Sequence, residues 1–340
     1  MQPFETLGHG GQVRRLKRLG QAALEEYPIR VVRLTPLVHE ENTTFRAVGD
    51  DGAHYVLRIT RPGESTIDLV RSEMLWLAAL RRDTKLVVPE PVATRSGDLL
   101  VVVAVEGVPE PRICVLFRWV EGRFLNSGLT ERHLWQVGEF TARLHDHAQS
   151  FKRPDGFVRR EVDRVDAEWE SNILRELGEA RPQADVETMQ AAIERIRAQL
   201  ERLGQAEGVF GLIHADLHQW NYLFHKGEVR AIDFDDCGNG HHLYDLGVSL
   251  YELEEHSRRR ELRAALLAGY RSVRQLPSTY ESALPAFLML RRIHIIQWQV
   301  DSRDHPAFRD RWEGGVTYDL GVLRSALDEP NYGVLSWVLG

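Results

Sequence analysis

Two short segments carry the residue types that phosphate chemistry needs. The first reads His-Ala-Asp-Leu-His-Gln-Trp-Asn and places Asp216 five residues before Asn221, and the second reads Ile-Asp-Phe-Asp-Asp and contains Asp233. A phosphoryl transfer needs a carboxylate that orients the attacking hydroxyl, and oxygen ligands for the Mg²⁺ that bridges the donor phosphates. Asp216 fits the first requirement, and Asn221 and Asp233 fit the second.

Short apolar runs flank these segments and predict the elements that position them. The runs cover residues 209–213, 222–224 and 229–232 and are separated by polar residues. Runs of this length between turn residues are typical of strands. The sequence therefore predicts a small β element that carries residues 214–221 in a loop at its mouth.

The first third of the chain predicts a small antiparallel sheet with one main helix. The expected strands are 29–34, 43–48, 54–59, 99–105 and 113–117. Gly-Asp-Asp-Gly at 49–52 is a hairpin signal. Helical periodicity appears over residues 12–27 and, for the main helix, over 64–82, which we expect to pack on the sheet.

Beyond residue 130 the helical period dominates. The predicted helices are 130–148, 164–180, 185–204, 242–273 with a break, 283–302 and 316–327. A chain of 340 residues is long enough for two domains. We expect a nucleotide-binding lobe over 1–117, a hinge over 118–123, and a catalytic and acceptor-binding lobe over 124–340.

The motif spacing matches the H-R-D-x-x-x-x-N loop of protein kinases, with Asp-Phe-Asp in place of Asp-Phe-Gly. The C-terminal half of the chain resembles the aminoglycoside phosphotransferase and choline kinase superfamily, especially its homoserine kinase-like and bacterial stress-response kinase members. The likeness extends to the segments 89–92 (Pro-Glu-Pro-Val), 142–145 (Ala-Arg-Leu-His) and 244–247 (Tyr-Asp-Leu-Gly).

This resemblance implies an α+β, bilobal protein-kinase-like fold with a small antiparallel-sheet lobe and a larger, mostly helical lobe. It implies Asp216 as catalytic base, Asn221 and Asp233 as magnesium ligands, and Asp245 as a support of the catalytic loop. The implied activity is transfer of the γ-phosphate of ATP to a hydroxyl of a small molecule, such as an amino alcohol or a homoserine-like or aminoglycoside-like compound.

Similar proteins hold the α- and β-phosphates with a strand lysine, whereas the matching position here is Arg58. None of the four lysines of the chain lies in a comparable strand. An arginine forms charge-assisted bonds to phosphate, but its planar fork differs from the point charge of a lysine. We expect Glu73, on the following helix, to be its ion-pair partner.

Two other segments are candidates for nucleotide contacts. The turn that contains Asn42 and Thr43 is not rich in glycine, and it either caps the phosphates or is a plain turn. The hinge segment 117–120, with Phe117 and Trp119, is expected to offer backbone groups to adenine, since a flat heterocycle needs edge hydrogen bonds for orientation.

The remaining residues of the two motifs have less specific interpretations. We expect His214 to fasten the loop and Trp220 to pack under it, while His218 is either a substrate contact or an exposed side chain. Asp235 and Asp236 either attract a cationic acceptor or an extra metal, or are simple loop acids.

Trp298 lies on a late helix whose residues line an acceptor pocket in similar proteins, but a tryptophan in such a helix is more often part of the core or of the surface.

Composition excludes several classes of protein. A formal net charge of −7 disfavours a nucleic-acid partner, which needs a concentrated basic surface. Two cysteines without C-x-x-C spacing indicate reduced thiols and a cytoplasmic location. No apolar run is long enough to span a membrane. The oligomeric state stays open.

Three other functions remain open. Arg58 and the turn without glycines are compatible with a nucleotide-binding pseudokinase, and the stress-response likeness is compatible with a protein serine/threonine kinase. His214, Asp216 and His218 form H-x-D-x-H, which in isolation could bind zinc for hydrolysis. A zinc site would give no role to Asn221 and Asp233.

Overall fold

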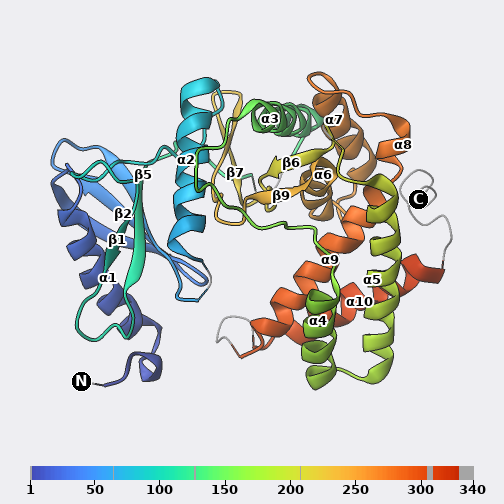
Figure 1. The fold of residues 1–340 in the computed structure, drawn as a ribbon, viewed down its shortest axis with the longest axis horizontal. Coiled ribbons are helices and arrows are strands. Elements are labelled where there is room, and N and C mark those ends of the chain that lie inside the picture. The colour runs from blue at the N-terminus through green and yellow to red at the C-terminus, as the bar shows by residue number, and fades with distance from the viewer. Residues whose placement is uncertain (1, 64, 126–127, 207, 305–308, 329–340) are drawn as a thin grey trace. The chain divides into compact units, whose positions relative to one another are not determined.

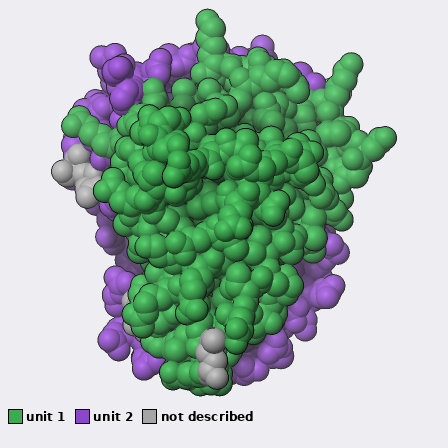
Figure 2. Space-filling model, turned by 90° about the vertical axis from the view of Figure 1, so that its left-hand side faces the viewer, with its two compact units in different colours: residues 1–123, 151–159, 230–235 green, residues 124–150, 160–229, 236–340 purple. Residues whose placement is uncertain are grey.

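The computed structural model describes residues 2–63, 65–125, 128–206, 208–304 and 309–328, and it divides into two compact units. Unit 1 comprises residues 1–123, 151–159 and 230–235, and unit 2 comprises 124–150, 160–229 and 236–340. Figure 2 colours the two units separately. Unit 1 thus contains two segments from later in the chain, one of which includes Asp233. The lobe boundaries expected from the sequence stay predictions.

Unit 1 contains a five-stranded antiparallel sheet with strand order β1-β2-β3-β5-β4. Its strands are β1 (Val31–His39), β2 (Thr43–Gly49), β3 (His54–Ile59), β4 (Val101–Val103) and β5 (Arg112–Arg118). The predicted hairpin joins β2 to β3, with Gly52 at a φ of 79° that favours glycine. The five predicted strands are confirmed.

Helix α1 (His9–Glu25), which follows a short 3-10 turn at Phe4–Thr6, covers one face of this sheet (Figure 1). Its apolar residues, such as Leu16 and Leu19, share one buried cluster with Phe45 and Leu57 of the strands. Gly20 permits the close approach, since a Cβ there would lie 2.8 Å from the side chain of Leu57.

Helix α2 (Ile67–Asp83) begins after Thr66, whose hydroxyl accepts a hydrogen bond from the N–H of Leu69. The prediction started this helix at residue 64, which lies outside the described residues. The apolar cluster under the sheet contains residues of α1 and none of α2. Helix α2 is instead joined to β3 by an ion pair between Glu73 and Arg58.

Unit 2 is mostly helical, as predicted. Its helices are α3 (Glu131–Ser150), α4 (Ala167–Ala180), α5 (Gln183–Leu203), α6 (His242–Tyr251), α7 (Arg259–Arg271), α8 (Ser278–Glu281), α9 (Leu284–Asp301) and α10 (Trp312–Asp328). The break expected within 242–273 separates α6 from α7, and the one-turn α8 was not predicted. The small sheet unit and the larger helical unit confirm the α+β fold class.

Two small sheets hold the motif segments. β6 (Phe210–Ile213) pairs with β9 (Gly238–His241), and β7 (Tyr222–His225) pairs with β8 (Glu228–Ala231). The sequence did not predict β9, because Gly-Asn-Gly-His has little strand propensity. Glycine is needed in this strand for close packing, because a Cβ at Gly238 would lie 2.7 Å from the carbonyl oxygen of Arg160. Among the described helices, none is long and apolar enough to cross a membrane.

Candidate active site

Asp216 lies in the loop between β6 and β7, in unit 2, and three side chains contact its carboxylate. Arg291 Nη2 lies 2.6 Å from Oδ1, and Asn221 Nδ2 lies 2.7 Å from Oδ2. His218 Nε2 lies 3.2 Å from the same Oδ2. The Asp216 side chain is 20% exposed, so it is held by its neighbours and still reachable from solvent.

The electrostatics of this cluster keep Asp216 ionised. Burial raises its pKa, but the charge of Arg291 and the hydrogen bond and charge of His218 lower it by more, to about 2. At neutral pH the carboxylate therefore accepts hydrogen bonds and carries a full negative charge. A group of this kind can orient a hydroxyl.

Two hydrogen bonds determine which way the side-chain amide of Asn221 faces. Its Nδ2 donates both to the Asp216 carboxylate and, at 2.9 Å, to the Asp216 backbone carbonyl. An ionised carboxylate and a carbonyl are acceptors only, so the amide nitrogen must face them. The atom that can ligate a metal is therefore Oδ1, an oxygen of the kind that Mg²⁺ prefers.

Asp245, at the start of α6, supports the backbone of the same loop. Its Oδ2 accepts from the N–H of His214 at 3.0 Å, and its Oδ1 accepts from the N–H of Ala215 at 2.7 Å. Ala215 has a φ of 71°, a conformation uncommon for a residue with a side chain. The two bonds hold this strained turn in place. His214 in turn accepts from the Asp216 N–H through Nδ1, at 3.3 Å, and its role in fastening the loop stays a prediction.

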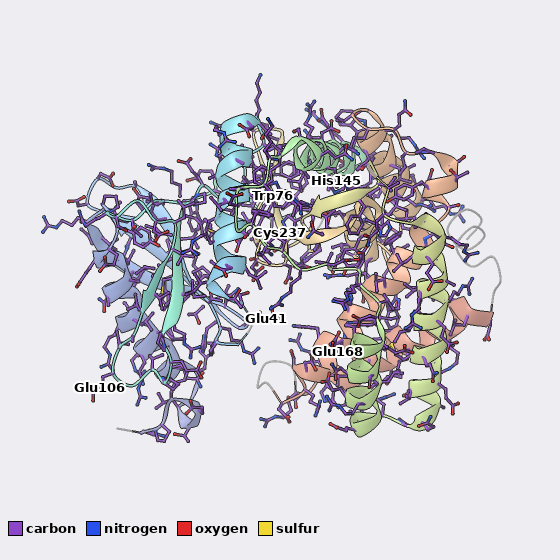
Figure 3. All side chains as sticks on the ribbon, viewed as in Figure 1. Glu41, Trp76, Glu106, His145, Glu168 and Cys237 are labelled. Carbon is purple, nitrogen blue, oxygen red and sulfur yellow. The ribbon has the colours of Figure 1, made fainter. Side chains whose placement is uncertain are left out.

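A histidine of α3 completes this support. His145, labelled in Figure 3, is fully buried, and its Nε2 lies 3.0 Å from Asp245 Oδ2. Its Nδ1 lies 3.0 Å from the Tyr270 hydroxyl. Burial lowers the pKa of His145 well below its usual value, so the ring is neutral. A neutral ring has one N–H, which Nε2 donates to the carboxylate while Nδ1 accepts from Tyr270.

In unit 1, Arg58 and Glu73 form the expected ion pair, with N–O distances of 2.9 and 2.5 Å. The Arg58 guanidinium also lies 5.5 Å from the ring centroid of Phe117. Burial lowers the pKa of Arg58, but Glu73, together with the charges of Asp235 and Asp233, raises it by more. Arg58 is therefore a fixed cation near two acids of the second motif.

The turn between β1 and β2 is attached to that motif. Asn42 Nδ2 donates to Asp235 Oδ2 at 2.6 Å, and Asn42 Oδ1 accepts from the N–H of Arg61. Arg159 donates to the Asp235 backbone carbonyl at 2.5 Å. Both the nitrogen and the oxygen of the Asn42 side-chain amide are therefore hydrogen-bonded inside unit 1, and the Asp235 carboxylate is bound by Asn42. A nucleotide role for Asn42 and an acceptor role for Asp235 stay predictions.

The hinge residues have partners as well. The Trp119 N–H donates to the His54 carbonyl, and the Trp119 ring lies 4.9 Å from the Arg46 guanidinium. Thr43, also expected near the nucleotide, is buried, and its hydroxyl lies 2.7 Å from His39 Nδ1. These contacts hold the hinge and the turn in place. A role of these residues in nucleotide binding stays a prediction.

Two tryptophans of the sequence analysis lie at the surface. Trp220 is 46% exposed and its ring lies tilted against that of Phe124, with 6.0 Å between the centroids, so the expectation that it packs under the loop was wrong. The fully buried Leu217 takes the inner position of the loop instead. Trp298 on α9 is 36% exposed.

The structure therefore gathers Asp216, Asn221, His214, His218 and Asp245 in unit 2, and Arg58, Glu73 and Asp235 in unit 1. Asp233 belongs to unit 1, has a φ of 64°, and acts electrostatically on Arg58. Asp236 belongs to unit 2 and acts on the Tyr244 hydroxyl. A shared metal for Asn221 and Asp233 stays a prediction. In the described residues, no group of three or more His, Cys, Asp or Glu side chains is arranged to hold a metal ion.

Sequence reasoning missed Arg291, the residue that contacts Asp216 Oδ1. Its signal was visible, since Arg291 and Arg292 interrupt the apolar run of a buried helix. Charged residues in such a position are almost always paired. The sequence did not show which carboxylate pairs with which arginine.

The comparisons with known proteins agree on one family. Residues 33–283 match the model of the "Phosphotransferase enzyme family". Amicoumacin kinase of Bacillus subtilis (strain 168) is 24% identical over 273 residues, which cover 76% of this chain and 77% of that protein. The expected likeness to stress response kinases and homoserine kinases is confirmed, at 24% identity over 299 residues and 32% over 206 residues for one Salmonella and one Rhizobium protein.

Solved structures show the same fold. A microcompartment-associated aminopropanol kinase is 29% identical, with a TM-score of 0.78 and coverage of 92% of this chain and 98% of that chain. An amicoumacin kinase in complex with AMP-PNP, Ca²⁺ and Ami is 22% identical, with a TM-score of 0.79 and coverage of 97% and 99%. These similarities confirm the protein-kinase-like fold.

Proposed function

The chain belongs to the phosphotransferase enzyme family and is an ATP-dependent kinase that acts on small molecules, and from that premise we propose that it transfers the γ-phosphate of MgATP to the hydroxyl of an amine-bearing acceptor. The observation that carries the proposal is the Asp216 carboxylate, which is fixed by Asn221, His218 and Arg291 and still 20% exposed.

In this proposal Asp216 accepts a hydrogen bond from the acceptor hydroxyl and aims its oxygen at the phosphorus, in line with the leaving oxygen of ADP. The O–P bond to the acceptor forms as the bond to ADP breaks, and the hydroxyl proton leaves towards Asp216. The strained Ala215 turn, held by Asp245, keeps the carboxylate in that position. No covalent intermediate on the enzyme is needed.

The donor set fits magnesium and a triphosphate. Asn221 offers an amide oxygen and Asp233 a carboxylate, and Mg²⁺ is usually bound by one or two protein oxygens together with substrate phosphates. When bound, the metal neutralises charge on the transferred phosphate. Arg58 is a buried cation that Glu73 holds by two bonds, and in this proposal it contacts the phosphates.

Similar proteins support the acceptor class. An aminopropanol kinase is 29% identical to this chain over nearly its whole length, and its name specifies an acceptor with both an amine and a hydroxyl. Homoserine kinases, at 32% identity over 58% of the chain, are named for an acceptor with the same two groups. We therefore propose an amino alcohol or a hydroxyl-bearing amino acid as the acceptor.

The test is a single-turnover assay with γ-labelled ATP, Mg²⁺ and a panel of 1-amino-2-propanol, homoserine, choline, an aminoglycoside and a serine-containing protein. We expect label on one of the amines, and its loss with Asp216→Asn, which still binds ATP. Loss of a positioned base typically costs about 10² to 10⁴-fold in rate.

The same assay separates the alternatives. Label on the protein and on none of the amines would replace the proposal with a protein serine/threonine kinase. ATP binding without transfer to any acceptor or to water would favour a pseudokinase.

A further inference from the structure

We propose that Arg291 is a positioning residue for Asp216, which fixes the orientation of the base carboxylate and so sets the rate of transfer. The inference deepens the proposed function and rests on the role of Asp216 in it. Arg291 reaches the loop from α9, 75 residues further along the chain, and its Nη2 lies 2.6 Å from Asp216 Oδ1.

With Arg291 in place, both oxygens of the Asp216 carboxylate have a partner. Asn221 and His218 contact Oδ2, whereas Arg291 contacts Oδ1. Without Arg291 the carboxylate would be tied through one oxygen and could rotate about its last side-chain bond. Placement of the attacking group within a few tenths of an ångström matters for the reaction, since a misplacement of 1 Å can cost about 10²-fold in rate.

The burial of Arg291 means that its guanidinium needs a charged partner. Arg291 is 9% exposed on a helix whose buried residues include Leu288 and Leu290, and a guanidinium in such a position is costly unless it is paired. Among the described residues, Arg291 forms an ion pair with Asp216.

The neighbouring arginine provides the contrast. Arg292 is also buried, but it is the next residue of α9 and pairs with Glu254 and Asp319 instead of Asp216. Its ion pairs join α9 to α10 and to the segment between α6 and α7. Arg292 is therefore a structural arginine, and it serves as the matched control for Arg291.

Polar and aromatic side chains lie next to Arg291. Arg291 lies close to the Tyr244 hydroxyl, which is 2.6 Å from His294 Nδ1, and the ring of Trp169 from α4 meets His294 edge-on at 5.7 Å. Tyr244, whose hydroxyl is held by His294, thus restricts the guanidinium. This support is what a positioning role requires, because a mobile arginine could not orient a carboxylate.

The first measurement compares Arg291→Met, Arg291→Lys and Arg292→Met by kcat and KM, with ATP and the best acceptor of the panel, and with water as the acceptor. We expect Arg291→Met to lower kcat about 10²-fold with little change in the KM for ATP. Arg291→Lys, which keeps the charge but not the fork, should recover part of that loss. Arg292→Met should lower the melting temperature and leave kcat close to that of the wild type.

The second measurement needs no acceptor. Melting temperatures of Arg291→Met, Asp216→Asn and the double variant form a cycle. We expect Arg291→Met to lower the melting temperature much less in the Asp216→Asn background, where it no longer leaves a buried charge unpaired.

Equal losses of melting temperature in the two backgrounds, or an unaltered kcat in Arg291→Met, would overturn the inference. A wild-type protein that transfers phosphate to no acceptor would overturn the proposed function instead, and the cycle would still decide whether Arg291 holds Asp216.

Discussion

Arg58 and Glu73 are joined by two parallel hydrogen bonds, at 2.9 Å between Nη1 and Oε1 and at 2.5 Å between Nη2 and Oε2, and both side chains are almost fully buried. A lysine has no second nitrogen with which to form this two-bond pair. The arginine that departs from the usual phosphate-binding residue is thus matched to its acid partner.

We predict that Glu73→Leu destabilises the protein by about 3 to 5 kcal/mol, because it leaves a buried guanidinium without its partner. The double variant Arg58→Met/Glu73→Leu should regain a large part of that stability, since an apolar pair needs no counter-charge. Thermal unfolding measures both effects. Titration calorimetry with AMP-PNP should find weak nucleotide binding in the double variant, and wild-type affinity there would rule Arg58 out as a phosphate ligand.

Asn221→Ala should raise the Mg²⁺ concentration needed for half-maximal activity, because it removes the amide oxygen proposed as a ligand. Loss even of partners that only orient metal ligands costs about 10- to 100-fold in affinity or activity, and we expect an effect at least as large. The measurement is the Mg²⁺ dependence of ATP turnover. Trp220→Ala, which changes the exposed neighbouring side chain, is the control and should leave this dependence unaltered.

The stacked pair His145 and His242 predicts loss of stability in weak acid. Their ring centroids are 4.2 Å apart, and burial lowers the pKa of both well below 6.5. The unfolded chain therefore binds more protons than the folded one as the pH falls below 6.5. The stability that is present above that pH should be lost progressively, by up to about 1.4 kcal/mol per pH unit for each histidine.

Urea unfolding between pH 7.5 and 5.5 measures this slope. His242→Phe keeps a ring stacked on His145 and removes one of the two titrating groups, so the slope should fall by about one proton per molecule. A variant with the slope of the wild type would show that His242 is already protonated in the folded protein.

Helices α3 and α7 meet at two glycines, and this contact holds the helix that carries His145. A Cβ at Gly138 would lie 1.9 Å from the Leu266 carbonyl oxygen, and one at Gly269 would lie 1.9 Å from the Trp135 carbonyl oxygen. We predict that Gly138→Ala destabilises the protein by about 1 to 3 kcal/mol or more, because backbone cannot move aside as a side chain can.

Gly321→Ala is the matched control, because it lies inside α10 with nothing within 4 Å of the added Cβ. It should stabilise the protein by up to about 1 kcal/mol, the difference in helix propensity between the two residues. Thermal unfolding compares the two variants. A similar melting temperature for both would mean that α3 and α7 are not in this close contact in solution.

The sequence alone determined the elements and the chemistry of the two motifs. The spacing of Asp216, Asn221 and Asp233 indicated phosphoryl transfer, and hydrophobic periodicity predicted the five-stranded sheet and the long helices. Both signals are local, because a motif or an amphipathic pattern lies within a few turns of chain. The family match over residues 33–283 agrees with what these motifs implied.

Only the tertiary structure decided which distant residues serve those motifs. β9 forms because β6 and the 160–162 segment enclose a strand of small residues, which propensity does not favour. Arg291 meets Asp216, and His145 meets Asp245 across 100 residues of chain. Such pairs form because buried charges and polar groups must find partners when the chain collapses, and no local pattern records which partner each will find.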